Sequence, residues 1–282
     1  MHLRGWIDKG EAALRAGPHP EKARRDAELL LLYAAGLSRS AFLAHSNEEL
    51  GLAAATHLDV LLERRLEGEP VQYITGECEF YGLPFRVTAD ALIPRPETEH
   101  LVECVLELAP CFAEPRIVDV GTGSGAIAVA LAHKLPDAHI AATDVSGVAL
   151  DLAGENARRN GVGDRIRFLQ GDLLAPVVAE RFDIVVSNPP YVPSADRNSL
   201  AVEIRDFEPG LALFAGEDGL DIYRRLIPAA FAVLASGGFI ALEIGCGQSD
   251  AVSSLLSGAG FSEIEFRLDL QGIPRVAVAR RP

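Results

Sequence analysis

The chain has 282 residues, of which 49% are hydrophobic and 23% are charged, so it is too apolar for a disordered protein and long enough for one large domain or two smaller ones. With 26 Lys and Arg against 40 Asp and Glu, the net charge is −14, which argues against a nucleic-acid substrate because domains that bind nucleic acid are usually basic. No stretch has the ~20 unbroken apolar residues of a membrane span, and the first residues lack the features of a signal peptide, so we expect a soluble cytoplasmic protein.

Residues 1–72 are predicted to form a helical domain. One helix covers residues 26–35 and ends at Gly36, a common helix stop. A second begins at Asn47 and runs to about Arg65, with these apolar residues at helical spacing: Leu50, Ala54, Leu58, Leu61 and Leu62. The domain has nine basic and eleven acidic residues, a net charge of −2, so most of the negative charge lies in the rest of the chain. It is either a substrate-recognition module or a packing cap for the larger domain, and the sequence leaves both interpretations open.

Residues 73–95 are predicted to form a β-hairpin linker, because turn residues in the segment Phe80-Tyr-Gly-Leu-Pro-Phe-Arg-Val separate two short β-prone runs. The linker ends in Leu92-Ile-Pro-Arg-Pro-Glu-Thr-Glu, where the prolines favour an extended path. Glu97 or Thr98 then starts a helix that runs to about Leu108. Residues 96–282 form the predicted catalytic domain.

From Arg116 on, predicted strands and helices alternate along the chain. The strands cover residues 116–120, 139–143, 165–169, 182–187 and 238–244. The helices cover residues 125–134, 147–160, 220–234 and about 250–257. Two further segments, 263–267 and 275–279, are expected to pair antiparallel. The alternation requires crossover connections and therefore predicts a Rossmann-like, doubly wound α/β sheet of seven strands, whose ligands bind at the carboxyl ends of the strands.

The loop after the first of these strands reads Asp119-Val-Gly-Thr-Gly-Ser-Gly and opens a helix. Glycines in such a loop permit a tight turn and let a ligand approach the backbone closely. The residues expected to contact a ligand are Gly121, Thr122, Gly123, Ser124 and Gly125. Their spacing differs from the G-x-G-x-x-G of dinucleotide sites, and no Lys-Ser/Thr pair follows as in a phosphate-binding loop. A nucleoside ligand without phosphates fits best.

Three residues after the next two strands suit the same ligand. Asp144 ends the second strand, where its carboxylate can accept two hydrogen bonds from ribose hydroxyls. Asp172 follows the third strand, where an adenine ring is expected, and Leu173 can pack on the face of that ring. Alternatively, Asp172 caps a loop and Leu173 is an ordinary packing residue. An adenosine compound such as S-adenosylmethionine satisfies all of these positions.

The segment Ser187-Asn-Pro-Pro-Tyr follows the fourth strand. Pro189 and Pro190 remove two backbone N–H donors, so the carbonyl oxygens of Asn188 and Pro189 stay available as acceptors, and the Asn188 side chain adds another. Together these acceptors can hold both hydrogens of a planar amino group, on which the ring of Tyr191 can stack. The structural alternative is a rigid turn after a strand, which Asn-Pro-Pro would also make.

An amide or exocyclic amine is a poor nucleophile because its lone pair is delocalised. Hydrogen bonds from both of its N–H groups to carbonyl oxygens stabilise the positive charge that develops during attack, and well-oriented reactants gain ~7–11 kcal/mol. No acid–base pair is needed before the attack, because the product can lose its proton afterwards. We therefore predict that Asn188, Pro189 and Tyr191 act in catalysis.

The glycine loop combined with Asn188-Pro-Pro-Tyr resembles amino-methyltransferases that use S-adenosylmethionine, a class that includes adenine-N6 DNA methyltransferases and protein glutamine methyltransferases. Five further segments resemble the HemK/PrmC family, the peptide chain release factor glutamine N(5)-methyltransferases. They are Pro70-Val-Gln-Tyr-Ile-Thr-Gly, Leu92-Ile-Pro-Arg-Pro-Glu-Thr-Glu, Phe207-Glu-Pro-Gly-Leu-Ala-Leu, Gly219-Leu-Asp-Ile-Tyr-Arg and Leu242-Glu-Ile-Gly. The resemblance extends from about residue 20 to the end of the chain.

The resemblance implies a class I S-adenosylmethionine-dependent methyltransferase domain, with S-adenosylhomocysteine as a product. It implies methylation of the side-chain amide of the glutamine in the Gly-Gly-Gln loop of class I release factors, a reaction that affects translation termination. The donor would contact residues 121–125, Asp144, Leu173 and Asn188. The glutamine would be held by Asn188, Pro189, Pro190 and Tyr191. The loop Arg95-Pro-Glu-Thr would help close the pocket, and the helical domain would dock the protein substrate.

The sequence departs from this pattern at Leu173, where some relatives carry an aromatic residue, so adenine stacking is expected to be weaker. An adenine-N6 DNA methyltransferase, the main alternative, would need a target-recognition region and a basic cleft, and the acidic chain shows neither. A non-catalytic binding module would not need Asn188 and Tyr191, and a dehydrogenase conflicts with the glycine spacing. We also expect a monomer without stable nucleic-acid or membrane binding and without a metal. The four cysteines are expected to be reduced and buried: Cys78, Cys104, Cys111 and Cys246.

Overall fold

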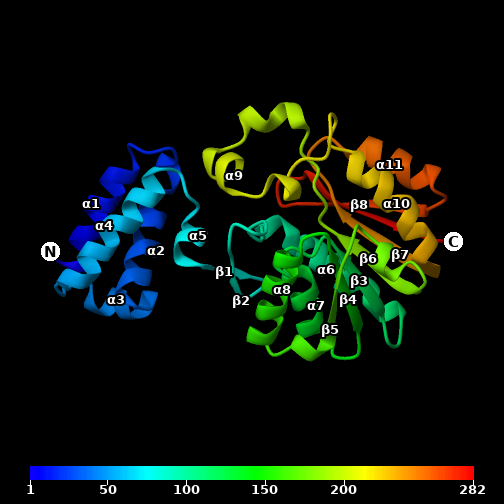
Figure 1. The fold of residues 1–282 in the computed structure, drawn as a ribbon, viewed down its shortest axis with the longest axis horizontal. Coiled ribbons are helices and arrows are strands. Elements are labelled where there is room, and N and C mark those ends of the chain that lie inside the picture. The colour runs from blue at the N-terminus through cyan, green and yellow to red at the C-terminus, as the bar shows by residue number, and fades with distance from the viewer. The chain divides into compact units, whose positions relative to one another are not determined.

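The computed structural model describes residues 1–282 as two compact units (Figure 1). The first unit is Met1–Glu77 together with Leu200–Phe207. The second unit is Cys78–Ser199 together with Glu208–Pro282. The short segment 200–207 thus belongs with the helical unit although it lies far along the chain from the rest of it. No local pattern in the sequence signals that assignment.

The first unit is mainly helical. Its helices are α1 (Leu3–Leu14), α2 (Ala23–Ala35), α3 (Arg39–His45), α4 (Leu52–Leu66), α5 (Val71–Thr75) and α9 (Val202–Phe207). The predicted end of α2 is confirmed, since Gly36 has a left-handed φ of 62°. The predicted start of α4 at Asn47 is wrong, because Glu49 forms a β-bridge with His2 and the helix begins only after Gly51. The backbone N–H of Leu50 accordingly donates to the carbonyl of Met1 rather than within a helix.

A buried cation holds three segments of the first unit together. The guanidinium of Arg65 donates from Nε to Asp26 Oδ2 at 2.6 Å and from Nη2 to Glu203 Oε2 at 3.0 Å. It also donates from Nη1 to the backbone carbonyl of Glu69 at 2.9 Å. The Arg65 side chain is only 1% exposed, so these partners compensate the cost of burying its charge. Through Glu203, this cluster anchors α9 to α2 and α4.

The second unit contains a seven-stranded sheet in the order β5-β4-β3-β6-β7-β9-β8. The strands are β3 (Arg116–Val120), β4 (His139–Asp144), β5 (Ile166–Gln170), β6 (Phe182–Ser187), β7 (Leu234–Glu243), β8 (Ser262–Leu268) and β9 (Pro274–Arg280). The pairs from β5 to β7 are parallel, and β9 runs antiparallel to both β7 and β8. The predicted fold class and the antiparallel terminal pair are confirmed. β7 begins at Leu234, four residues before the predicted start at Gly238.

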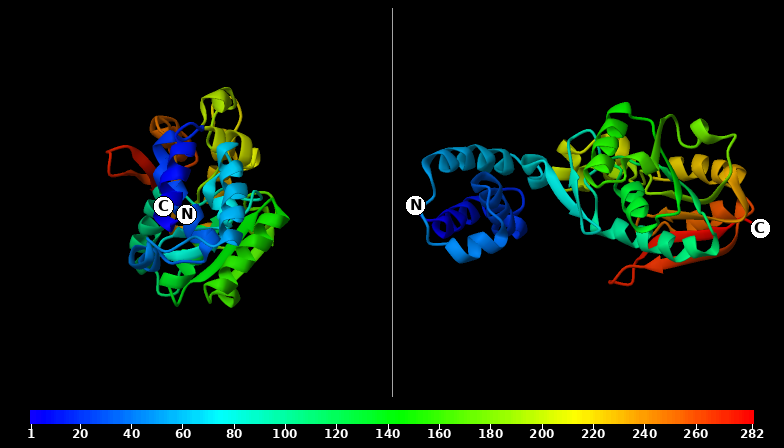
Figure 2. Two further views of the ribbon diagram at one scale, coloured as in Figure 1. Left: turned by 90° about the vertical axis from the view of Figure 1, so that its left-hand side faces the viewer. Right: turned by 90° about the horizontal axis from the view of Figure 1, so that it is seen from below.

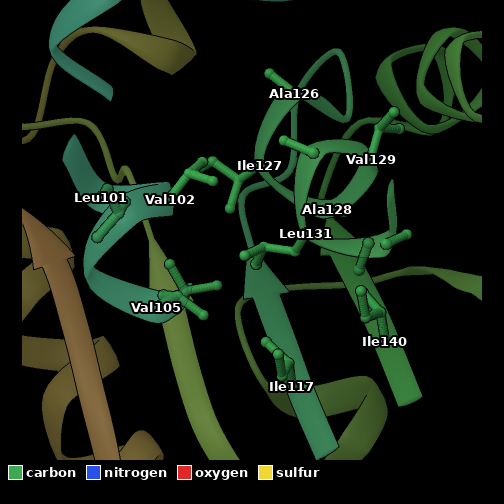
Figure 3. Packing of buried hydrophobic residues seen from close by; sticks show 14 of the residues in the cluster. Leu101, Val102, Val105, Ile117, Ala126, Ile127, Ala128, Val129, Leu131 and Ile140 are labelled. Atoms are coloured by element: carbon green, nitrogen blue, oxygen red, sulfur yellow. The ribbon is translucent and has the colours of Figure 1, made fainter. Parts of the chain in front are cut away.

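Helices cover both faces of this sheet (Figures 1 and 2). They are α6 (Glu99–Leu108), α7 (Ala126–Lys134), α8 (Gly147–Arg159), α10 (Asp221–Val233) and α11 (Ser249–Gly258). Adjacent residues of one strand point to opposite faces, so Ile117 packs in the cluster with α6 and α7, whereas Val118 packs with α10 and α11. Figure 3 shows side chains of α6 and α7, including Val105 and Leu131, gathered over the strands. These two buried layers fix the sheet and hence the loops at its ends.

The predicted hairpin is also confirmed, with strands β1 (Glu77–Phe80) and β2 (Leu83–Arg86). Its two loop residues, Tyr81 and Gly82, have φ values of 53° and 73°, as the twist of a two-residue hairpin requires. The helix predicted to start near Thr98 follows a short 3-10 turn, Pro96–Thr98, and forms α6.

The expectation that all four thiols are buried is wrong for two of them. Cys104 is buried and Cys78 is half-buried, whereas Cys111 and Cys246 are exposed. Burial raises the pKa of Cys104 to about 11 and that of Cys78 to about 12. All four are free thiols.

No single helix is long and apolar enough to cross a bilayer, and only the bent pair Pro20–Ala35 with Arg39–His45 reaches that length and composition jointly.

Replacing Arg65 with Ala is expected to lower the free energy of unfolding of the first unit by about 3–5 kcal/mol, because Asp26 stays buried without its cation. Trp6, the chain's single tryptophan, is 2% exposed in this unit and reports its unfolding by fluorescence in a denaturant titration. The neighbouring variant Arg64→Ala is the control, since Arg64 pairs with Glu69 while 40% exposed, and it should cost at most about 1 kcal/mol. Equal losses in both variants would contradict the account of the buried cluster.

Candidate active site

A cavity of about 440 Å³ lies at the carboxyl ends of β3, β4 and β6 in the second unit. The chain adds β4 and β5 on one side of β3, and β6 and β7 on its other side, so the strand order reverses next to β3. Ligands bind at this point in doubly wound sheets. The predicted site residues that line this cavity are Arg95, Gly121, Thr122, Gly123, Ser124, Asp144, Asp172, Leu173, Asn188, Pro189 and Pro190. Gly125 and Tyr191 do not line it.

The glycine loop has its backbone in a conformation that favours glycine, with φ values of 72° at Gly121, 55° at Gly123 and 82° at Gly125. A Cβ atom added to Gly121 would meet nothing within 4 Å, so this glycine leaves open space at the cavity wall. A Cβ atom on Gly125 would lie 3.0 Å from Ala153 Cβ. Gly125 therefore permits close packing against α8, and its contact with a ligand stays a prediction.

The base of the loop is held from within the sheet. The backbone N–H groups of Gly121 and Thr122 donate to the carbonyl of Thr143 at 2.8 and 3.0 Å. The Thr122 hydroxyl donates to Asp119 Oδ2 at 2.6 Å. Burial raises the pKa of Asp119 to about 7, while the hydrogen bond from Thr122 acts in the opposite direction. The loop is thus fixed before any ligand arrives.

Asp144 ends β4 and has its carboxylate fixed at the cavity. Its Oδ2 accepts from the backbone N–H of Gly123 and its Oδ1 from that of Ser146, both at 2.9 Å. A carboxylate has about four acceptor positions, so each oxygen can still accept a hydroxyl hydrogen. This arrangement fits the paired hydroxyls of a ribose ring.

The loop after β5 brings two predicted residues to the cavity, and α10 adds an unpredicted one. The Asp172 carboxylate forms an ion pair with Arg225 of α10, which also lines the cavity. Leu173 has a φ of 49°, an uncommon conformation for a residue with a side chain. It packs at the edge of the hydrophobic cluster beneath α10. Arg225 has no sequence motif that could have identified it.

Asn188 follows β6 and begins a chain of hydrogen bonds to Thr98 and Glu243, two residues to which the sequence assigned no individual role. Its Nδ2 donates to Thr98 Oγ1 at 3.0 Å, and the Thr98 hydroxyl donates to Glu243 Oε2 at 2.6 Å. The parallel pairing of Ser187 with Leu242 places Asn188 next to Glu243 in the register. Thr98 and Glu243 do occur in the segments Arg95-Pro-Glu-Thr and Leu242-Glu-Ile-Gly, whose resemblance to a family was the available signal.

Tyr191 is turned towards the same carboxylate. Its hydroxyl donates to Glu243 Oε1 at 3.3 Å, and its backbone carbonyl accepts from Gln248 Nε2 at 3.0 Å. Burial and the neighbouring Glu243 raise the pKa of the Tyr191 phenol above its ordinary value. The predicted stacking of its ring on a planar substrate group stays a prediction.

Arg95 lines the cavity but is also paired within the chain. Its Nη2 donates to Glu208 Oε1 at 2.5 Å, and the Glu208 side chain is 1% exposed. Glu208 directly follows α9, so this ion pair fixes the point at which the chain re-enters the second unit. Arg95 thus lines the cavity while its guanidinium is held by Glu208.

Residues 5–76 match the domain family described as the PrmC N-terminal domain, and residues 97–204 match the one described as the methyltransferase small domain. The chain is 49% identical over 261 residues to a release factor glutamine methyltransferase of Moorella thermoacetica, covering 92% of this chain and 91% of that one. It is 44% identical over 283 residues to the protein of the same name from Deinococcus radiodurans, covering 100% and 99%. The crystal structure of a methyltransferase from Pyrococcus furiosus superimposes with a TM-score of 0.53 at 19% identity, over 71% of this chain and 90% of that one, and shows a shared fold.

Two alanine variants of the glycine loop are expected to separate ligand binding from packing. Both share the strain of a side chain at positive φ, about 1–2 kcal/mol. Gly121→Ala should in addition lower the affinity for S-adenosylmethionine by about tenfold, because its methyl group would occupy open space in the cavity. Gly125→Ala should lower the melting temperature more, because it crowds Ala153. Calorimetric titration and thermal unfolding measure the two effects, and the reverse ranking would contradict these assignments.

Proposed function

Because the chain belongs to the release factor glutamine methyltransferase family, we propose that it methylates the side-chain amide nitrogen of the glutamine in the Gly-Gly-Gln motif of class I release factors. S-adenosylmethionine supplies the methyl group as an electrophile on a sulfonium centre. The observation that carries the proposal is the position of Asn188 at the cavity, with its NH2 group bonded to Thr98 and its carbonyl oxygen left as an acceptor. A glutamine side chain offers the two N–H donors that such an acceptor needs.

The residues around the cavity fit the donor. Gly121 leaves room at the backbone for a ligand, and Asp144 keeps acceptor positions for the ribose hydroxyls. Asp172 and Leu173 line the part of the cavity where we place the adenine ring. The loop lacks a phosphate-binding motif, which agrees with a donor that carries no phosphate.

The chemistry then depends on acceptors around the glutamine amide. Oδ1 of Asn188 and the backbone carbonyl of Pro189 accept the two amide hydrogens and favour the charge that develops on nitrogen. Pro189 and Pro190 have no N–H group, so no backbone donor competes at these positions. Holding the amide nitrogen in line with the methyl group orients the two reactants and so lowers the free-energy barrier. The extra proton leaves the product after transfer, so no residue of the chain has to act as a base beforehand.

We further propose that the first unit docks the release factor. It has its own buried core, built from residues such as Trp6, Leu30 and Leu58, and it matches the PrmC N-terminal domain. Residues 1–72 of this unit have a net charge of only −2, which suits a protein partner. The alternative is that this unit only packs as a cap.

Hydrogen exchange distinguishes docking from capping in the full-length protein. Adding a release factor is expected to slow amide exchange in α1–α4 as well as around the cavity, because a docked partner excludes water. A release factor whose glutamine is replaced by alanine serves as the control and should protect the helices equally. Protection confined to the second unit would contradict the docking role.

We also propose that the protein acts in the cytoplasm as a monomer and binds neither nucleic acid stably nor membranes. The net charge of −14 supports the absence of nucleic-acid and membrane binding, because it repels phosphate-rich surfaces. The alternative of an adenine-N6 DNA methyltransferase is not favoured, because the similar full-length proteins carry the release factor name.

The function is tested by incubating the protein with S-adenosylmethionine and a release factor and locating the methyl group by tandem mass spectrometry. We expect a single methyl group on the glutamine of Gly-Gly-Gln and none on a factor with alanine at that position. Duplex DNA is included as a competing acceptor. A methyl group on adenine, or on another residue of the factor, would overturn the proposal.

In the same assay, Asn188→Ala is expected to lower kcat by about 10²–10³-fold, as does the loss of one preorganised hydrogen-bonding group at a reacting centre. Asn198→Ala is a matched control, because Asn198 is exposed and does not line the cavity. It should keep wild-type turnover. If Asn188→Ala stayed within a few-fold of the wild type, Asn188 would have no role in holding the amide.

A further inference from the structure

We propose that Thr98 and Glu243 are positioning residues that orient the side-chain amide of Asn188, so that its carbonyl oxygen and not its NH2 group faces the substrate glutamine. The inference rests on the proposed function, since it assigns a role to two residues behind the same site. It concerns a chain of hydrogen bonds whose direction is set at its buried end.

The buried end is Glu243, the last residue of β7, which is 2% exposed. Its two carboxylate oxygens each accept from a different hydroxyl, Oε2 from Thr98 at 2.6 Å and Oε1 from Tyr191 at 3.3 Å. Burial raises the pKa of Glu243, while the hydrogen bonds from Thr98 and Tyr191 act in the opposite direction. The ionised carboxylate can only accept hydrogen bonds, so in that form both contacts have one direction and both hydroxyls are donors.

That direction determines the next contact. A threonine hydroxyl has a single hydrogen, and the hydrogen of Thr98 is used towards Glu243. Its oxygen can then only accept, so the side chain of Asn188 has to present its NH2 group, which it does at 3.0 Å. The carbonyl oxygen of Asn188 is on the other branch of the planar amide and remains for the substrate.

The opposite orientation of Asn188 would be unfavourable at both ends. Its Oδ1 would face the lone pairs of Thr98, and its NH2 group would face the N–H donors of the glutamine. Polar groups that are removed from water without a partner cost about 1–3 kcal/mol. The chain of hydrogen bonds from Glu243 through Thr98 to Asn188, called the relay below, thus disfavours the orientation of Asn188 that would block binding of the amide.

The placement of Thr98 supports a role other than helix capping. Thr98 occupies the N-cap position of α6, where a threonine oxygen commonly accepts from the backbone of the first turn. Here the side chain forms no such capping bond. Thr98 is 4% exposed at the cavity wall, and its hydroxyl is directed to Glu243 and Asn188 instead.

Two substitutions at position 98 separate orientation from packing. Thr98→Val keeps the shape and removes the hydroxyl, whereas Thr98→Ser keeps the hydroxyl and removes a methyl group. We expect Thr98→Val to lower kcat for release factor methylation by up to about 100-fold, as misplacement of a reacting group does, with little change in the affinity for S-adenosylmethionine. Thr98→Ser should stay close to the wild type. Equal activity of the two variants, with the wild type active, would overturn the relay and leave the proposed function intact.

A double variant tests whether Thr98 acts through Asn188. If it does, Thr98→Val should slow the Asn188→Ala enzyme by no more than about twofold, the margin of independent sites. A further large loss in the double variant would show that Thr98 acts by another route and would overturn the proposal.

A spectroscopic measurement tests the relay without any turnover. The chain has five asparagines, so selective ¹⁵N-asparagine labelling yields five side-chain amide signals, and the signal of Asn188 is the one missing in Asn188→Ala. This signal should move in Thr98→Val and stay in place in Thr98→Ser. An unchanged signal in Thr98→Val would overturn the relay even if the wild type failed to methylate release factors, a failure that would count against the proposed function alone.

Discussion

An amide nitrogen attacks poorly because its lone pair is shared with the carbonyl group, so a catalyst has to surround its two hydrogens with acceptors when the new bond forms. A single donor among those acceptors would repel the substrate. The side chain of Asn188 carries both an acceptor, its carbonyl oxygen, and a donor, its NH2 group. The hydrogen bond from the NH2 group to Thr98 leaves the carbonyl oxygen to face the cavity. The two prolines that follow add the carbonyl oxygen of Pro189 and no N–H group. The architecture of the second unit can be understood as the means of holding this arrangement.

The parallel sheet brings the necessary groups to one edge. β3 ends in the glycine loop, β4 in Asp144, β6 in the segment that starts at Asn188 and β7 in Glu243. Because these strands are parallel and in register, their carboxyl ends meet although the residues are far apart in the sequence. Two hydrophobic layers, one with α6 and α7 and the other with α10 and α11, hold the strands from both faces. The site is therefore placed by rigid elements, which favours precise orientation of the amide.

The sequence pattern was sufficient for features that depend on local order. β3 and β6 have the predicted bounds, and the helix stop at Gly36 and the hairpin around Gly82 follow from the backbone freedom of glycine. The start of α4 was mispredicted because Leu50 fits the helical spacing, whereas the adjacent Glu49 forms a β-bridge with His2. Spacing alone cannot report a partner 47 residues away.

The residues of the candidate site likewise divide into those that local sequence order predicts and those that distant contacts position. The glycine loop, Asp144 and Asn188 follow predicted strands, so their meeting at one edge was predictable from the topology. Thr98 and Glu243 were not, because Thr98 bonds to residues 90 and 145 positions away in the chain. The ion pair between Arg65 and Glu203 likewise joins residues 138 positions apart and assigns α9 to the first unit. Long-range polar contacts of this kind leave no periodic signal in one sequence.

The central claim is that the carbonyl oxygen of Asn188, and not its NH2 group, meets the substrate amide. It is tested most directly by a crystal structure of the protein with S-adenosylhomocysteine and a release factor domain that carries Gly-Gly-Gln. We predict that Oδ1 of Asn188 and the carbonyl oxygen of Pro189 lie about 3 Å from the glutamine amide nitrogen, while Asn188 Nδ2 keeps its bond to Thr98. A glutamine amide that contacts neither oxygen, or an Asn188 side chain that has left Thr98, would contradict it.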